Sequence, residues 1–268
     1  MPLIFHIGTP MAVAEFEPLS RAAAARGLRT VMYSRPGYGR STRQRGHTVA
    51  DAAVEVRLVL DHLQADRFVT LGWSGGGPRA LACAALFGDR CLAAISIGGV
   101  APYAASDFDW LAGMTDGNVA EYSAALKGES ALQAHLERVA SGAASLQAAT
   151  VLGWLSRDGI APETAPLAAR FAEFVATSFR QSQLEGIWGW LDDDLALTHD
   201  WGFDLAAIQR PVGIWQGTKD TMVPLSHGSW LAEHIPHARP RFYGGHGHFG
   251  PVVVMLDRIL DELLEVVR

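Results

Sequence analysis

The sequence is poor in cysteine, with only Cys83 and Cys91 among its 268 residues. The two residues do not form a C-x-x-C pair, which excludes a zinc knuckle and a dithiol redox motif of that type. Cys83 lies in an alanine-rich stretch with helical spacing, and Cys91 opens the next apolar run. We therefore expect two buried, reduced thiols.

An excess of positive charge is also missing. The formal net charge is −6, and like charges do not gather in long blocks. A nucleic-acid-binding protein needs a basic face for the phosphates, so nucleic acid is disfavoured as a partner and a small-molecule substrate is expected. The ten histidines form no H-E-x-x-H or comparable cluster, and we expect neither a metal nor a cofactor. The oligomeric state is not indicated.

Long hydrophobic runs are absent as well. No run reaches the ~18 apolar residues that a membrane span requires. The first residues, MPLIFHIGTPMAVAEF, lack a basic segment and are interrupted by Gly8 and Pro10, which favours a strand and a loop over a signal peptide. We therefore expect a cytoplasmic protein that does not associate with a membrane.

The sequence does contain a regular alternation of short apolar runs and helical periodicity. The apolar runs predict strands at residues 3–7, 29–34, 68–72, 92–97, 210–217 and 238–245, and helical spacing predicts helices within 12–26, 49–63, 77–87 and 251–267. The first four strands are almost continuously apolar, as expected when helices cover both faces of a sheet. Repeated strand–helix units predict an α/β fold with a parallel sheet.

The pattern changes in the middle of the chain. From about residue 107 to 200 helical stretches dominate and β-branched runs disappear. The simplest interpretation is one α/β core made of residues 1–106 and 201–268, with residues 107–200 as a helical insertion. The acidic run at residues 192–194 is expected to be a solvated surface or a helix boundary rather than a cation site.

A glycine-rich stretch, GWSGGGPRA, joins the predicted strand at 68–72 to the predicted helix at 77–87. One interpretation is a phosphate loop, because residues 75–80 match G-x-G-x-x-A. Such a dinucleotide site also needs an acidic residue about 20 positions later, whereas the next strand ends in Ile97-Gly98-Gly99. A Walker loop is excluded because no lysine follows the glycines. The phosphate interpretation is therefore disfavoured.

The other interpretation is a serine nucleophile, since residues 72–76 read G-x-S-x-G around Ser74. Such a turn strains the backbone at the serine and requires nearly side-chain-free neighbours two positions before and after it. The strain lifts the hydroxyl off the end of the strand, and the following helix directs its amides toward developing negative charge.

A general base and an acid follow in the order that a serine hydrolase requires. Asp220 lies in KDTMVP, directly after the strand at 210–217, where sites in open α/β sheets gather. His246 and His248 lie in GGHGHFG, after the next strand. The order Ser, Asp, His is typical of serine hydrolases of the α/β type.

With these elements the sequence resembles the α/β-hydrolase-fold serine hydrolases along nearly the whole chain. FHIGTP is similar to the family's H-G-x-P turn with Gly8 as the motif glycine, and GTKDTMVP matches G-x-x-D-x-x-V-P. GHGHFG is similar to the family's G-H ending, which makes His248 the base and leaves His246 at a variable position. The resemblance implies an oxyanion hole formed by the amides of Thr9 and Gly75.

Two departures from the family pattern stand out. SRPGYGRS, residues 34–41, resembles the D-x-P-G-x-G-x-S loop with Ser34 in place of the usual acid, which weakens a turn contact but touches no catalytic role. Members also commonly carry two antiparallel strands before the H-G strand. Here we expect about six mainly parallel strands with residues 3–7 at the edge, because either those strands are missing or the true start lies upstream.

The resemblance implies a serine hydrolase that cleaves an acyl bond of a small, apolar substrate, with ester cleavage favoured over amide, thioester or C–C cleavage. Members that open epoxides or displace halides use an aspartate at the elbow, which disfavours those reactions. The alternative is a ligand-binding or receptor-like protein of the same fold with little turnover. The insertion resembles the cap that many members place over the site, and a cap needs an apolar underside. Most of the large aromatic residues of the insertion are nevertheless expected in the core. These residues are Trp110, Trp154, Trp188, Trp190, Phe171, Phe174 and Phe179.

Overall fold

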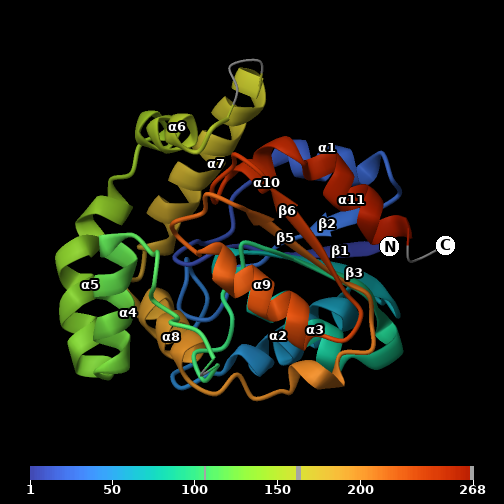
Figure 1. Ribbon diagram of the computed structural model, residues 1–268, viewed down its shortest axis with the longest axis horizontal. Coiled ribbons are helices and arrows are strands. Elements are labelled where there is room, and N and C mark those ends of the chain that lie inside the picture. The colour runs from blue at the N-terminus through green and yellow to red at the C-terminus, as the bar shows by residue number, and fades with distance from the viewer. Residues whose placement is uncertain (106, 161–163, 266–268) are drawn as a thin grey trace.

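The six apolar runs form the six strands of one sheet in the computed structural model, which describes residues 1–105, 107–160 and 164–265 (Figure 1). The strand order is β2-β1-β3-β4-β5-β6, and every neighbouring pair is parallel. The prediction of about six mainly parallel strands is therefore confirmed. The strands are β1 (Pro2–His6), β2 (Arg29–Val31), β3 (Phe68–Trp73), β4 (Cys91–Ile97), β5 (Val212–Gly217) and β6 (Ala238–Tyr243).

The predicted position of the first strand is wrong. We expected residues 3–7 at the edge of the sheet, but β1 lies between β2 and β3. It pairs with β2 through Leu3↔Thr30 and with β3 through Leu3↔Val69. That edge is the three-residue strand β2, and β1 is apolar because its side chains are buried on both faces of the sheet.

Helices cover both faces of the sheet because the pleat sends alternate side chains to opposite sides. Leu3 and Phe5 join one buried cluster with α1 (Glu17–Ala24), α10 (Gly250–Val254) and α11 (Leu256–Glu265). Ile4 joins the other cluster with α2 (Ala52–His62), α3 (Gly77–Leu86) and α9 (Leu225–His234). Single turns of 3-10 helix lie at Val49–Asp51, Ser74–Gly76, Gly88–Arg90 and Leu205–Ala207.

Two predicted helices differ from the observed ones. The stretch at 12–26 becomes helical only at Glu17, with Pro18 in the first turn. The single helix predicted for 251–267 is divided at Met255 into α10 and α11, and the end of that prediction lies outside the described residues. The division lets Leu256, Ile259 and Leu260 of α11 pack into the same core as α1.

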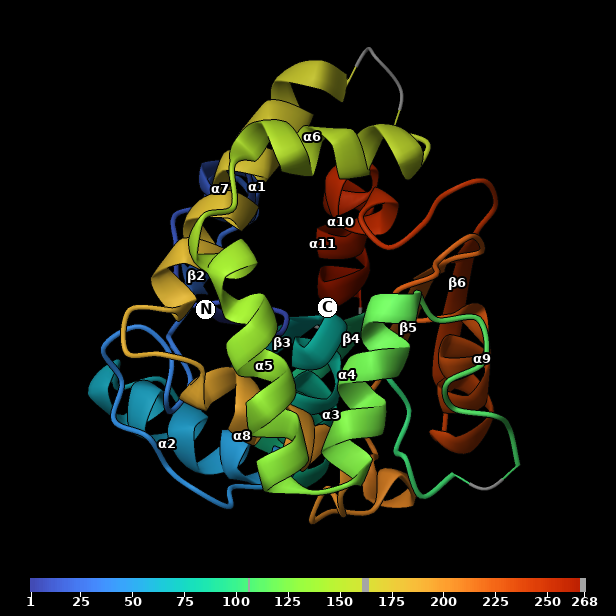
Figure 2. The same cartoon turned by 90° about the vertical axis from the view of Figure 1, so that its left-hand side faces the viewer.

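The segment between β4 and β5 is helical, as predicted, and its helices gather at one side of the sheet (Figures 1 and 2). Phe171 and Phe174 are buried and pack on Phe16, with ring centroids 5.6 and 5.0 Å away. The division at residues 107–200 stays a prediction, and residue 106 lies outside the described residues. The helices are α4 (Asp116–Leu126), α5 (Glu129–Ala144), α6 (Ala148–Arg157), α7 (Ala165–Ser182) and α8 (Trp188–Thr198).

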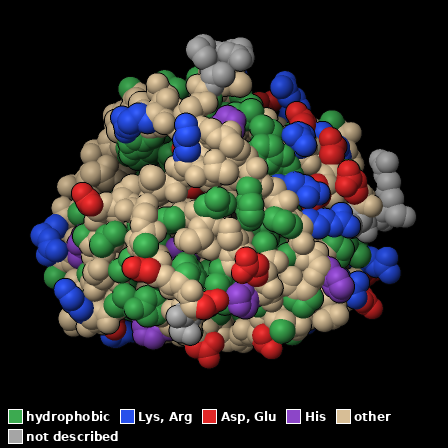
Figure 3. Space-filling view, in the orientation of Figure 1, with side chains coloured by type: hydrophobic (Ala, Val, Ile, Leu, Met, Phe, Trp, Pro, Cys, Tyr) green, Lys and Arg blue, Asp and Glu red, His purple; other side chains and the backbone are tan. Residues whose placement is uncertain are grey.

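The state of the two thiols and the mixed charges of the surface are those expected from the amino-acid composition. Cys83 and Cys91 are free and buried, as expected. Charged side chains of both signs are dispersed over the face in Figure 3, with hydrophobic side chains between them. Among the described residues, no helix is both long and apolar enough to cross a membrane. The cellular compartment stays a prediction.

Helix α2 offers a test of the packing on one face of the sheet. Leu60 is fully buried in the cluster with α3, whereas Leu58 in the same helix is 68% exposed. Leu60→Ala should lower the free energy of unfolding by about 2–5 kcal/mol, since it removes buried methylene groups and leaves a cavity. Leu58→Ala is the matched control and should change the free energy of unfolding by less than about 0.5 kcal/mol. Urea unfolding of both variants measures the difference, and equal effects would contradict the placement of α2.

Candidate active site

Ser74 lies at the sharp turn between β3 and α3. Its φ is 55°, one of three positive values among the described non-glycine residues. Positive φ is strained for a residue with a side chain, and such strain is typical of functional turns. The turn follows the carboxyl end of β3 directly, and α3 begins three residues after Ser74. The strand–turn–helix context predicted for G-x-S-x-G is present.

The turn depends on close backbone approaches at Gly72 and Gly76. A Cβ on Gly72 would overlap the Gly76 carbonyl oxygen, and a Cβ on Gly76 would overlap the carbonyl oxygen of His6 in β1. Any side chain at either position would force the turn away from β1. This explains why the residues two before and two after Ser74 are glycines.

The loop after β1 packs directly against this turn. A Cβ built on Gly8 would lie 3.1 Å from the Ser74 Cβ, and one built on Gly75 would lie 3.3 Å from the Thr9 amide nitrogen. Thr9, which precedes a cis Thr9–Pro10 peptide, is therefore the neighbour of Gly75 across the two loops. The two residues expected to supply an oxyanion hole lie side by side.

Asp220 and His248 meet at the carboxyl ends of β5 and β6. The Nδ1 atom of His248 lies 2.7 Å from Oδ2 of Asp220, and both residues are buried. The other oxygen, Oδ1, accepts hydrogen bonds from the amides of Met222 and Val223 at 2.9 and 2.8 Å. A fixed acceptor at Nδ1 places the ring proton there and leaves Nε2 free to accept a proton.

His248 is also held from the side of the serine. The indole of Trp73, the residue before Ser74, lies 5.5 Å from the imidazole and donates to the His248 carbonyl oxygen at 3.4 Å. Burial disfavours the protonated imidazole, but the carboxylates of Asp220 and Asp158 leave the pKa of His248 above its ordinary value. Among the described residues no hydrogen bond joins His246 to Asp220: the His246 carbonyl accepts from the Lys219 amide, and its Nδ1 is buried without a hydrogen-bond partner.

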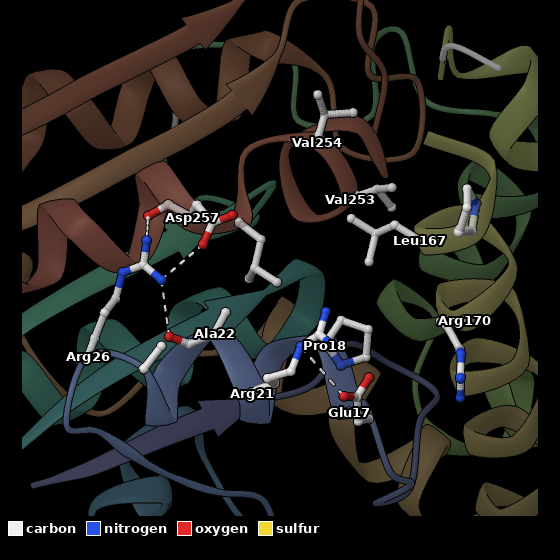
Figure 4. Close-up of a pocket in the computed structure, with 13 residues that line it drawn as sticks. Glu17, Pro18, Arg21, Ala22, Arg26, Leu167, Arg170, Val253, Val254 and Asp257 are labelled. Atoms are coloured by element: carbon white, nitrogen blue, oxygen red, sulfur yellow. Dashed lines mark hydrogen bonds and ion pairs between the residues drawn. The ribbon is translucent and has the colours of Figure 1, made fainter. Parts of the chain in front are cut away.

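A cavity of about 370 Å³ opens beside His248. Its walls come from α6 and from the loops after β5 and β6, and they include Trp154, Met222 and Phe249, with Arg157 and Lys219 also lining it. A larger hollow of about 550 Å³ lies between α1, α7 and α10–α11 and holds none of the candidate residues (Figure 4). There Arg26 pairs with Asp257 and Arg21 with Glu17. Among the candidate catalytic and oxyanion-hole residues, His248 alone lines the smaller cavity, which therefore lies beside the site.

The interpretation of the acidic run as a solvated surface is wrong. Residues 192–194 are at most 3% exposed and lie inside α8. Asp192 pairs with Arg43 at 2.7 Å, and Asp193 pairs with Arg35 at 2.6 Å and with Arg79. The available signal was Arg79 within the alanine-rich stretch of α3, because a buried cation requires a carboxylate partner.

Asp158, at the end of α6, is a site residue that sequence reasoning missed. Its Oδ2 accepts hydrogen bonds from the amides of Phe249 and Gly250, at 3.0 and 2.6 Å. These are the two residues directly after His248, so the carboxylate fixes the loop that carries the imidazole. The sequence around Asp158 gave no sign of a partner 91 residues away.

Comparisons with known proteins establish the family of the fold. A family model described as the alpha/beta hydrolase fold matches residues 1–253, and the chain belongs to that family. A non-heme haloperoxidase from Rhodococcus erythropolis is 25% identical over 278 residues, which cover 100% of this chain and 92% of that protein.

Solved structures show the same fold. A bromoperoxidase from Bacillus anthracis matches with a TM-score of 0.70 at 20% identity, covering 99% of this chain and 91% of that chain. An esterase from Exiguobacterium antarcticum matches with a TM-score of 0.65 at 20% identity, covering 100% of this chain and 92% of that chain.

Asp158 gives a pH-dependent prediction. His248 must be neutral to accept a proton, so activity should rise with pH through its pKa, which the Asp158 carboxylate helps to raise. Asp158→Asn removes that charge and should shift the acid limb of the kcat/KM profile to lower pH. Asp66→Asn removes the same charge from an exposed residue before β3, at the other end of the sheet, and should leave the limb in place. An unchanged limb in Asp158→Asn would contradict the electrostatic link.

Proposed function

We propose that this protein is a serine hydrolase that cleaves an acyl ester through Ser74, His248 and Asp220. The proposal is supported by three separate segments that follow the carboxyl ends of parallel strands, at one edge of the sheet. These are a strained serine turn after β3, a buried imidazole–carboxylate pair after β5 and β6, and the Thr9 loop after β1. The esterase and haloperoxidase relatives support a hydrolase.

The reaction begins with attack of the Ser74 Oγ on the acyl carbonyl carbon, while His248 Nε2 takes the hydroxyl proton. Asp220 keeps the proton on Nδ1 and stabilises the imidazolium. The amides of Thr9 and Gly75 bind the oxyanion of the tetrahedral intermediate. The imidazolium then gives its proton to the leaving alkoxide, and the C–O bond breaks to leave an acyl-enzyme. Water, deprotonated by His248, releases the acid by the reverse sequence.

The proposed substrate is small and carries an apolar acyl group. The cavity beside His248 has about 370 Å³ of room, and Trp154, Met222 and Phe249 give it an apolar wall. Trp154 and Phe249 stack with their ring centroids 6.2 Å apart, so α6 covers the loop that carries His248. In this proposal residues 107–200 act as a cap over the site.

Hydrolysis of p-nitrophenyl esters of short and medium acids tests the proposal. Ser74→Ala and His248→Ala should lower kcat by about 10⁶, and Asp220→Asn by about 10⁴. His246→Ala should stay near wild type, because the Asp220 carboxylate is hydrogen-bonded to His248. A small fluorophosphonate should add once to wild type and not to Ser74→Ala, as read by intact mass.

Retention of more than about a tenth of the activity in Ser74→Ala would contradict the covalent mechanism, since loss of a nucleophile normally removes far more. A folded wild-type protein that neither hydrolyses these esters nor takes the label would favour the receptor-like alternative.

A further inference from the structure

A buried charge cluster lies directly behind the two loops of the proposed oxyanion hole. Its centre is the carboxylate of Asp193 in α8, which is fully buried, with the guanidinium groups of Arg35 and Arg79 only 2% exposed. The Tyr38 hydroxyl donates to the same carboxylate at 2.9 Å. Buried ions are costly unless they are paired and hydrogen-bonded, and this carboxylate is surrounded by donors.

Arg35 contacts the peptide that carries one of the proposed oxyanion donors. Its Nη2 donates to the Gly8 carbonyl oxygen at 3.0 Å, and its Nη1 donates to the Ile7 carbonyl oxygen at 2.6 Å. The Gly8 carbonyl and the Thr9 N–H belong to one planar peptide group. A cation donating to that carbonyl polarises the group and makes the Thr9 N–H a stronger donor.

The same cluster holds the second half of the hole. Arg79 Nη1 donates to the Gly75 carbonyl oxygen at 2.6 Å, while its Nη2 donates to Asp193. The Thr9 hydroxyl donates to Oδ2 of Asp193 at 2.7 Å. One carboxylate therefore fixes Thr9 through its side chain and Gly75 through Arg79.

The charges in direct contact do not cancel. Burial disfavours an ionised Asp193, but Arg35 and Arg79 hold the pKa of its carboxyl well below the usual range, so one anion faces two cations. Burial and the neighbouring Glu121 raise the pKa of Asp194 well above its usual value, which favours its neutral form.

Three further titratable groups surround the cluster. Burial, together with Arg35 and Arg79, lowers the pKa of His6 to about 3 and keeps it neutral. His47 Nε2 lies 3.6 Å from Asp193, and Glu55 interacts with both arginines only from beyond ion-pair distance. A positive excess thus lies next to the peptides, in a setting where little water screens it.

We propose that Arg35, held in place by Asp193, is a positioning residue that orients and polarises the Gly8–Thr9 peptide for binding of the oxyanion. Arg79, bound to the same carboxylate, anchors Gly75 through the carbonyl of the following Gly75–Gly76 peptide and so fixes the position of the second proposed donor without polarising it. The inference rests on the proposed hydrolase function and adds to it a link from α8 to the reacting centre. It assigns Asp193 of the buried acidic run a role in catalysis as well as in packing.

The rival explanation is that Arg35 only ties α8 to the sheet. A purely structural ion pair would affect stability and would leave the balance between ground-state and transition-state binding unchanged. Arg43 provides the matched control, because it pairs with the adjacent Asp192 of α8 at 2.7 Å and makes no contact with the Gly8 or Gly75 peptides.

The experiment compares wild type, Arg35→Met, Arg35→Lys and Arg43→Met. The readouts are p-nitrophenyl butyrate kinetics, inhibition by 1-butaneboronic acid and thermal unfolding. The boronate forms a tetrahedral adduct on the serine and therefore reports binding in the oxyanion hole.

Arg35→Met should lower kcat by about 10²–10³ with KM changed less than about threefold, and should weaken boronate binding in parallel. Arg35→Lys keeps the charge without the forked geometry of the guanidinium. Its kcat and boronate affinity should therefore lie between those of wild type and Arg35→Met. Arg43→Met should keep kcat and boronate affinity near wild type even where its unfolding temperature falls.

A folded Arg35→Met with wild-type kcat and boronate affinity would overturn the inference. If both Arg35 variants fail to fold, Thr9→Val decides, because it removes the hydroxyl that donates to Asp193 and accepts from Arg35. A loss of kcat and boronate affinity at unchanged KM supports the link, and wild-type values contradict it. Absence of hydrolysis and of boronate binding in wild type would instead contradict the proposed function itself.

Discussion

The geometry around Ser74 depends on the close approach of two backbone segments, the end of β1 and the turn after β3. Gly76 touches the His6 carbonyl and Gly72 touches Gly76, so no side chain fits between them. That contact holds Ser74 at a φ of 55° and brings the Thr9 loop against Gly75. Parallel pairing of His6 with Gly72 ends both strands at the same edge. The turn at Ser74 and the proposed oxyanion donors therefore follow from one packing constraint.

The charges of the site are arranged around this backbone frame. On one side, Asp220 fixes His248, and the amides of Met222 and Val223 hold the Asp220 carboxylate in place. On the other side, Asp193 holds Arg35 against the Gly8–Thr9 peptide and Arg79 against the Gly75 carbonyl. Both carboxylates accept several hydrogen bonds, which compensates for their burial. The helical segment between β4 and β5 supplies Asp158 and Asp193, so it contributes contacts to the candidate site.

Much of the fold could be predicted because its signals are local. Apolar runs located all six strands, and G-x-S-x-G located the turn, since each pattern reports on a few neighbouring residues. Asp220 and His248 could be found because each follows a strand, and parallel strands end at one edge. The burial of residues 192–194 could not be found, because it depends on Arg35, Arg43 and Arg79 from distant segments. The edge position of β2 and the role of Asp158 depend likewise on tertiary contacts.

The most direct test of the central claim is rapid acid quenching of the protein with p-nitrophenyl butyrate, followed by peptide mass mapping. The proposed mechanism predicts a butyryl group on the peptide that contains Ser74, formed together with the first burst of p-nitrophenol and lost as turnover proceeds. Release of p-nitrophenol without an adduct on Ser74, or with the acyl group on another residue, would contradict it.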